Sequence, residues 1–168
     1  MNQKGFIRWI ILVIMLIAGA VFIYFKAADS LPGEIIYPIK EIRENLSLTS
    51  FIADYYKGAV IYTDLTKERF EEVLKLIDKK SSDDKIKTAL DKLILSQKKT
   101  LQYIETGKSK GYKLNSNLDE FEKILFEERE SLSRLLYQVP ESLYDSMRNT
   151  IQTISENIDR TRVAKVRS

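Results

Sequence analysis

The 168-residue chain contains no cysteine and no histidine, and these two absences exclude several kinds of chemistry. Without cysteine the chain forms no disulfide, has no thiol nucleophile and carries no lipid-modified N-terminal cysteine. The usual protein ligands of zinc are missing, and so is the side chain that most often acts as a general base near neutral pH. No glycine-rich phosphate loop is present either. We therefore predict a protein that is not an enzyme, with no catalytic residue, no metal site and no cofactor.

Glycine and proline are scarce, with six and three residues, so the composition is not that of a fibrous or disordered chain. The 27 basic and 24 acidic side chains give a formal net charge of only +3. Part of this excess falls in the first 30 residues, which leaves the rest of the chain nearly neutral. A nucleic-acid-binding surface requires a strong basic excess on one face, so we predict no nucleic-acid partner.

One long apolar run is present, from Phe6 to Phe25, and it reads FIRWIILVIMLIAGAVFIYF. Arg8, near its start, is its only charged residue. Twenty helical residues are about 30 Å long, which equals the thickness of the hydrocarbon core of a bilayer. We therefore predict that residues 6–25 cross a lipid bilayer as a signal anchor.

The charges that flank this run predict its orientation. Lys4 and Arg8 lie at its start, whereas Lys26 and Asp29 cancel each other after it. By the positive-inside rule, residues 1–5 lie in the cytoplasm and the C-terminal part lies outside. A signal peptide that is cleaved is the alternative, because it also combines basic residues, an apolar stretch and small residues. Both interpretations place the rest of the chain outside the cytoplasm.

From Pro38 onward apolar residues recur at steps of three and four, which predicts α-helices, and no stretch alternates as a strand does. Residues 81–84, Ser-Ser-Asp-Asp, mark a helix start, and Pro140 ends one helix and can open the next. The predicted fold class is all-α: an N-terminal transmembrane helix, a short helix and an antiparallel bundle of about four main helices. The predicted segments are a linker at 26–37, the bundle at 38–160 and a basic tail at 161–168.

The short helix that begins at Pro38 has its own apolar seam. Ile39, Ile42 and Leu46 follow one another at helical steps, which predicts that they pack together on one face. We also expect Leu31, Ile36 and Tyr37, which precede this helix or open it, to pack onto the bundle rather than to form a free tether.

Several groups of polar side chains invite a functional interpretation. Adjacent acidic residues occur as pairs, and we expect them on solvated faces, because neighbours on a helix point about 100° apart and make a poor metal cage. These pairs include Glu71-Glu72, Asp83-Asp84 and Glu127-Glu128. The end of the chain is basic and lacks acid, which suits contact with anionic lipid headgroups or wall polymers. Its basic residues are Arg160, Arg162, Lys165 and Arg167.

The nine tyrosines are divided by their positions in the pattern. Tyr55, Tyr62 and Tyr144 fall in helical seams, so we expect them in the core. Tyr112 lies in a predicted polar loop, TGKSKGYKLNS (residues 106–116), which contains Gly107 and Gly111. It is the tyrosine that we expect to contact a partner protein.

The segment after the apolar run carries a pattern that resembles a known family. Leu31-Pro32-Gly33 is followed after three residues by Tyr37-Pro38 and then by Lys40. This opening is similar to that of a bacterial family of extracytoplasmic helical domains of unknown function. Two later patterns also resemble the family: Glu68-Arg69-Phe70-Glu71-Glu72 and Leu136-Tyr137-Gln138-Val139-Pro140-Glu141. The signature residues are Leu31, Pro32, Gly33, Tyr37, Pro38, Lys40, Arg69, Val139 and Pro140.

The resemblance covers roughly residues 31–160, implies an extracytoplasmic helical domain and transfers no catalytic residue. Relatives with this domain include anti-sigma-factor-like membrane proteins, in which a cytoplasmic segment precedes the membrane helix. Few residues precede Phe6 here, so we expect no sigma-factor-binding segment. We predict a protein of the bacterial cytoplasmic membrane that acts by contact with another envelope protein, as a scaffold or sensor subunit. A secreted helical ligand-binding module, released by signal peptidase, is the alternative.

Overall fold

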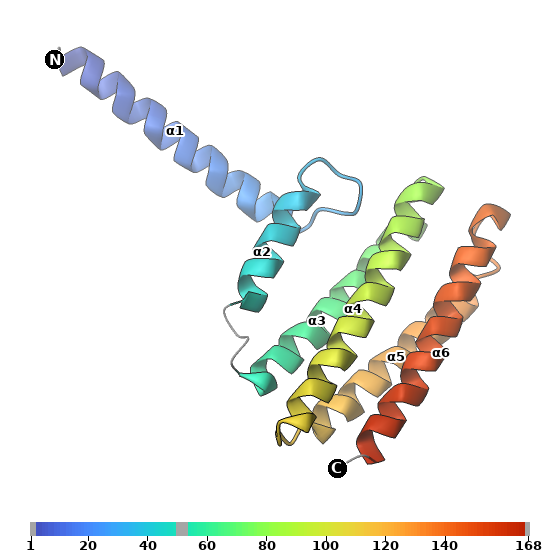
Figure 1. Cartoon of the computed structure of the whole chain (residues 1–168). Helices are drawn as coiled ribbons and strands as arrows, with labels where there is room; N and C mark the ends of the chain where they lie inside the picture. Colours follow the sequence, from blue (N-terminus) through green and yellow to red (C-terminus); the bar gives the residue numbers. More distant parts are fainter. Residues whose placement is uncertain (1–2, 50–53, 167–168) are drawn as a thin grey trace. The chain divides into compact units, whose positions relative to one another are not determined.

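The structure, a computed structural model, describes residues 3–49 and 54–166, with only the backbone described at residues 3–8 and 49. No strand occurs in these two ranges, so the predicted all-α class is confirmed (Figure 1). The elements are α1 (Gln3–Ala27), α2 (Tyr37–Thr49), α3 (Tyr55–Asp78), α4 (Asp83–Ser109), α5 (Asn115–Leu135), the short 3-10 helix η1 (Glu141–Leu143) and α6 (Tyr144–Val166). Contacts divide the chain into two units, Met1–Leu46 and Ser47–Ser168.

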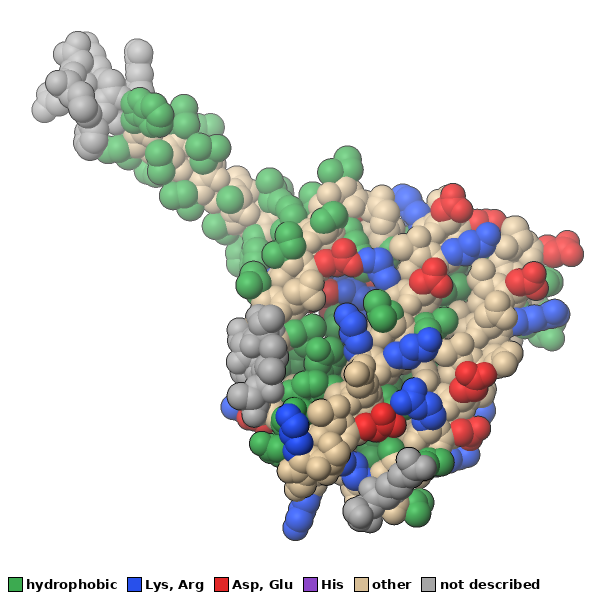
Figure 2. Space-filling view, in the orientation of Figure 1, with side chains coloured by type: hydrophobic (Ala, Val, Ile, Leu, Met, Phe, Trp, Pro, Cys, Tyr) green, Lys and Arg blue, Asp and Glu red, His purple; other side chains and the backbone are tan. Residues whose placement is uncertain are grey.

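α1 presents an apolar surface that is exposed from Trp9 to Phe25 (Figure 2). Residues Trp9–Ala27 are long and apolar enough to cross a membrane, and only 6% of this span is buried. A core helix that is apolar all round would instead be covered by the rest of its domain. The side chain of Arg8 and residues 1–2 of the predicted cytoplasmic segment lie outside what the structure describes.

Leu31-Pro32-Gly33 opens a tight turn after α1. The Glu34 N–H donates to the Leu31 carbonyl at 3.0 Å, and Gly33 has a φ of 85°. A type II turn favours proline at its second position and a left-handed glycine at its third, which explains the order of these residues. The Glu34 carboxylate accepts a second bond from the Leu31 N–H, also at 3.0 Å. Leu31 and Tyr37 are each only 4% exposed, so this segment is a packed part of the protein.

α2 begins at Tyr37, so Pro38 lies in its first turn, where a missing N–H costs nothing. The three residues of the predicted apolar seam share one face of this helix, but that face is not covered. Ile42 and Leu46 are exposed, whereas the charged Lys40 is buried. The face of α2 that is covered is therefore not the apolar one.

α3 to α6 pack side by side as two hairpins (Figure 1). Within the hairpins, α3 packs against α4 and α5 packs against α6. Between the hairpins, the contact of α4 with α6 is larger than that of α3 with α5. Alternate helices run in the same direction, so the C-terminal ends of α4 and α6 lie together. Leucine dominates the interior, where burial of each such side chain contributes about 1.5–3 kcal/mol. Fully buried side chains include Leu76, Leu90, Leu93, Leu101, Leu118, Phe121, Leu125, Leu132 and Met147.

α3 ends in a turn that places a lysine in an unfavourable conformation. The Lys80 N–H donates to the Ile77 carbonyl at 2.9 Å, and the Ser81 N–H donates to the Leu76 carbonyl at 3.0 Å. This is the Schellman arrangement, in which the residue after the helix cap is left-handed. Lys80 adopts this conformation with a φ of 47°, which costs a residue with a Cβ about 1–2 kcal/mol.

α4 ends in the same arrangement, but with Gly111 in the left-handed position at a φ of 87°. The helix reaches Ser109, so Gly107 lies inside it and the predicted loop shrinks to residues 110–114. α6 similarly continues to Val166, which makes residues 161–166 of the predicted tail helical. These two helices are longer than the sequence pattern indicates because Gly107 and the basic residues do not interrupt them.

Replacing Lys80 with glycine is expected to stabilise the four-helix unit by about 1 kcal/mol, because glycine adopts the left-handed conformation without a steric cost. The side chain of Lys80 is exposed, so the change removes no packing. Urea unfolding of the full chain in detergent, followed by circular dichroism, measures the difference. Gly111→Ala is the matched control and should lower the free energy of unfolding by a similar amount. Equal stability of Lys80→Gly and the original chain would contradict this account.

Candidate functional site

A tyrosine stack, a groove and a group of ion pairs lie at one end of the four-helix unit. We call it the α4–α6 end, because α4 and α6 finish there. α3 and α5 begin at this end, and the connection 110–114 crosses it from α4 to α5. α4 and α5 share few contacts, so this connection joins helices that are diagonal to each other.

Four tyrosines form a continuous stack at the α4–α6 end. The ring centroids of Tyr112 and Tyr55 lie 5.0 Å apart, those of Tyr55 and Tyr103 5.1 Å, and those of Tyr103 and Tyr62 4.9 Å. Such pairs contribute about 0.5–1.5 kcal/mol each beyond the area that they bury. Burial, helped by the neighbouring rings of Tyr55 and Tyr62, raises the pKa of the Tyr103 hydroxyl. Lys110 donates to the Tyr55 hydroxyl at 2.6 Å and lies 4.8 Å from the centroid of its ring.

Tyr112 is the outermost ring of this stack and is 44% exposed. The sequence pattern placed Tyr55 and Tyr62 in the core, but both are only half-buried. Gly58 provides the space for the stack, since a Cβ at this position would lie 2.3 Å from the Tyr103 hydroxyl. Glycine inside a helix lowers its stability, and the close approach of Tyr103 explains why Gly58 is nevertheless present in α3.

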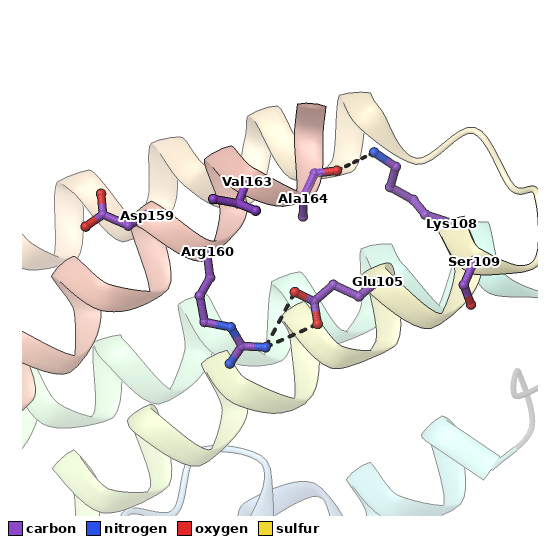
Figure 3. Close-up of a pocket in the computed structure, with 7 residues that line it drawn as sticks. All are labelled: Glu105, Lys108, Ser109, Asp159, Arg160, Val163 and Ala164. Carbon is purple, nitrogen blue, oxygen red and sulfur yellow. Dashed lines mark hydrogen bonds and ion pairs between the residues drawn. The ribbon is translucent and has the colours of Figure 1, made fainter. Parts of the chain in front are cut away.

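A groove of about 950 Å³ runs between the last turns of α4 and α6 (Figure 3). Its lining residues are Glu105, Lys108, Ser109, Asp159, Arg160, Val163 and Ala164. Arg160 reaches across from α6 and donates to both carboxylate oxygens of Glu105, at 3.2 and 3.4 Å. Lys108 reaches in the opposite direction and donates to the Ala164 carbonyl at 2.5 Å. The Ala164 carbonyl lies in the last turn of α6, where carbonyl groups have no N–H partner within their own helix. The Lys108 ammonium therefore supplies a donor that the helix lacks.

The groove combines both signs of charge with the half-exposed apolar side chain of Val163. The Arg160–Glu105 pair is well exposed to water, so it contributes at most about 1 kcal/mol and can open without large cost. Charged groups that can separate, beside an exposed apolar side chain, are suited to packing against a polypeptide segment.

A second set of ion pairs ties α6 to α5. Arg162 donates to Glu122 at 2.7 Å, and Lys165 bonds both to Glu122 and, at 2.6 Å, to Asp119. Hydrogen bonding by Lys165, with that of Arg162, lowers the pKa of the Glu122 carboxyl despite its partial burial. Burial opposes the charge of Lys165, but the bonds to Asp119 and Glu122 outweigh it and raise the pKa of the lysine.

These ion pairs involve the basic residues that the sequence predicts to contact an anionic surface. Arg160, Arg162 and Lys165 are all brought to the α4–α6 end, but each is already paired with a carboxylate. Arg167 lies outside the described residues. The three described residues therefore do not form a patch of unneutralised positive charge.

A buried polar network joins α4, α5 and α6. The Gln97 amide donates to the Glu128 carboxyl at 2.6 Å, and the Asn157 amide donates to the Gln97 oxygen at 3.0 Å. Glu128 is only 1% exposed, and its Oε1 has no hydrogen-bond partner in the described residues. Burial raises the pKa of Glu128 to about 8, against the opposing effect of the Gln97 bond. The carboxyl is therefore mostly protonated and neutral at pH 7, which avoids an uncompensated charge in the core.

A buried ion pair joins two residues of the pattern Glu68-Arg69-Phe70-Glu71-Glu72. Arg69 donates to Glu72 at 2.8 Å, and both side chains are almost fully buried within α3. Breaking a buried ion pair by removal of one partner typically costs about 3–5 kcal/mol. Of the later signature residues, Val139 is also buried, while Pro140 caps η1.

The expectation that all adjacent acidic residues lie on solvated faces is wrong for two of the pairs. Glu72 and Glu128 are buried, while Glu71 and Glu127 beside them are exposed. Neighbouring residues on a helix point about 100° apart, so one member of a pair can enter the core.

No group of three acidic, cysteine or histidine side chains that could hold a metal ion occurs within residues 3–49 and 54–166. Comparison with protein-family models, with curated proteins and with solved structures finds no match to this chain.

The raised pKa of Glu128 predicts how stability depends on pH. The folded state holds this proton up to about pH 8, whereas the unfolded state releases it near pH 4.5, so stability falls as pH rises between these values. This one group contributes a slope of at most about 1.4 kcal/mol per pH unit. Glu128→Gln should remove that slope in urea unfolding curves measured from pH 5 to 9.

Glu127→Gln is the matched control. It removes the neighbouring, exposed carboxylate, which raises the pKa of Glu128 less than burial does, and should leave most of the slope in place. Parallel pH profiles for the original chain and for Glu128→Gln would show that Glu128 does not hold its proton in the folded state.

Proposed function

We propose that this chain is a single-pass protein of the bacterial cytoplasmic membrane, in which residues 6–25 cross the bilayer. The observation that carries this proposal is the exposed apolar surface of α1 over Trp9–Ala27. Such a surface is unfavourable in water, whereas the bilayer interior is an apolar phase of matching thickness. A helix also bonds its backbone N–H and C=O groups internally, as the bilayer interior requires.

In the proposed orientation residues 1–5 lie in the cytoplasm and the four-helix unit lies outside. Lys4 and Arg8 support this orientation through the positive-inside rule. Trp9 and Tyr24, near the two ends of the span, suit the two membrane interfaces. The resemblance of the LPG and YP pattern to extracytoplasmic helical domains supports the same placement.

The four-helix unit acts by protein contact, without catalysis, as a scaffold or sensor subunit of the cell envelope. The exposed ring of Tyr112 supports this role, because it is held by the stack below it and loses little conformational freedom on binding. Tyr56, at the start of α3, is exposed at the same end. Aromatic side chains of this kind are enriched where proteins bind one another.

A secreted form is the second candidate. Ala18-Gly19-Ala20 provides small residues inside the apolar run at which a signal peptidase could cut. The mature chain would then begin with the apolar residues 21–25, which disfavours this alternative.

The topology is testable because the chain has no cysteine of its own. A single Ser109→Cys variant, expressed in bacteria, should react with a membrane-impermeant maleimide in intact cells, since Ser109 is exposed in the four-helix unit. Asn2→Cys should react only after permeabilisation. The protein should stay with membranes in alkaline carbonate and keep its full mass of 19.5 kDa. A mature chain that starts near Val21 would support the secreted form.

The contact role is testable with a photoreactive phenylalanine analogue in place of Tyr112. In cells of the source bacterium it should crosslink to one envelope protein as a discrete band. The same analogue at Tyr137, which is 78% exposed and follows the far end of α5, is the matched control and should give no such band. Equal crosslinking from both positions would mean that Tyr112 marks no specific interface.

A further inference from the structure

α2 is an amphipathic helix that exposes apolar side chains and buries a lysine, the opposite of what is expected in water. Ile42 and Leu46 are 60% and 63% exposed. On the other side Tyr37 and Lys40 are 4% and 2% exposed. A helix surrounded by water is expected to turn its apolar residues inward and its lysine outward.

The two sets of residues occupy opposite faces. At 100° per residue, Ile39, Ile42 and Leu46 fall within an arc of about 60°. Tyr37 and Lys40 fall on the far side of the helix by the same geometry. Ile35, which precedes α2, adds a further apolar side chain that is 98% exposed. The exposed face therefore forms an apolar stripe, rather than a single exposed residue.

The stripe belongs to the same unit as α1, Met1–Leu46. The Arg43 guanidinium lies 5.7 Å from the centroid of the Tyr24 ring, so the second turn of α2 lies beside the last turns of α1. The chain between them is short and held by the turn at Pro32-Gly33. α2 is therefore tied to the end of α1 at which a transmembrane helix would leave the bilayer.

We propose that α2 lies in the interface of the outer leaflet, with Ile35, Ile42 and Leu46 inserted among the lipid headgroups and upper acyl chains. This inference rests on the proposed transmembrane role of α1. The interface provides the apolar surroundings that the exposed stripe requires, and it accounts for the inward position of Lys40.

The charge of α2 indicates which lipids it needs. Lys40 and Arg43 are balanced by Glu41 and Glu44, so the helix has no net charge from these side chains. Binding is then driven by the apolar stripe and does not depend on anionic lipid, unlike the binding of basic amphipathic helices.

The cysteine-free chain allows each position to be probed in its native setting. Single Cys variants of the full chain at Ile35, Ile42 and Leu46 are labelled with an environment-sensitive fluorophore and reconstituted into phosphatidylcholine vesicles. Nitroxide groups near the headgroup end of the acyl chains serve as quenchers. Ser47→Cys is the matched control, because Ser47 is exposed and lies one residue from Leu46 but about 100° around the helix.

We expect quenching at Ile35, Ile42 and Leu46 that is at least about twofold stronger than at Ser47, with or without phosphatidylglycerol. A label at Leu16, in the middle of α1, tests the membrane span separately with a quencher placed deep in the bilayer. Quenching at Leu16 together with water-exposed labels at Ile42 and Leu46 would overturn the interfacial role of α2 and leave the anchor intact.

Two further outcomes also overturn the inference. Labels at Ile42 and Leu46 that report apolar surroundings but resist lipid quenching would mean that protein, either the four-helix unit or a second copy, covers the stripe. A label at Leu16 that escapes quenching would remove the membrane span, and the interfacial helix with it.

Discussion

The side-chain amide of Gln97 fixes how three of the four helices meet. Its nitrogen and its oxygen bond to different helices, α5 through Glu128 and α6 through Asn157, in a fully buried position. Leucine seams alone tolerate a shift along the helix axis, because one apolar side chain can take the place of another. The same shift would leave these buried polar groups without partners, which costs about 1–3 kcal/mol for each. The common end of the helices, and the groove and tyrosine stack on it, follow from this alignment.

Local signals in the sequence predict much of the helical framework. Asp83 and Asp84 fill the first turn of α4 after the cap residue Ser82, and Pro38 lies in the first turn of α2. These predictions succeed because a helix start is determined by residues within one turn of it. The end of α3 gives no such signal, since Lys80 occupies a position where glycine is usual and is held there by the turn itself.

The buried acids could not be predicted in the same way. One clue was present in α5, where the apolar spacing has a seven-residue gap between Leu125 and Leu132 that Glu128 fills. Its hydrogen-bond partner Gln97 lies 31 residues away on another helix, so no local pattern contains the pair. The exposed stripe of α2 was missed for a different reason. Apolar spacing shows which residues share a face, but not whether that face meets protein or lipid.

The pairing of neighbouring helices has a consequence for how the unit forms. α3 with α4, and α5 with α6, make the two largest interfaces, and each joins segments that are adjacent in the chain. In the proposed topology these segments cross the membrane in order, α3 and α4 first. The first hairpin can therefore close while the second is still in the translocation channel. In that topology the open side of the first hairpin, including Gln97, would be the template onto which α5 and α6 dock, and assembly of the domain would follow the direction of export.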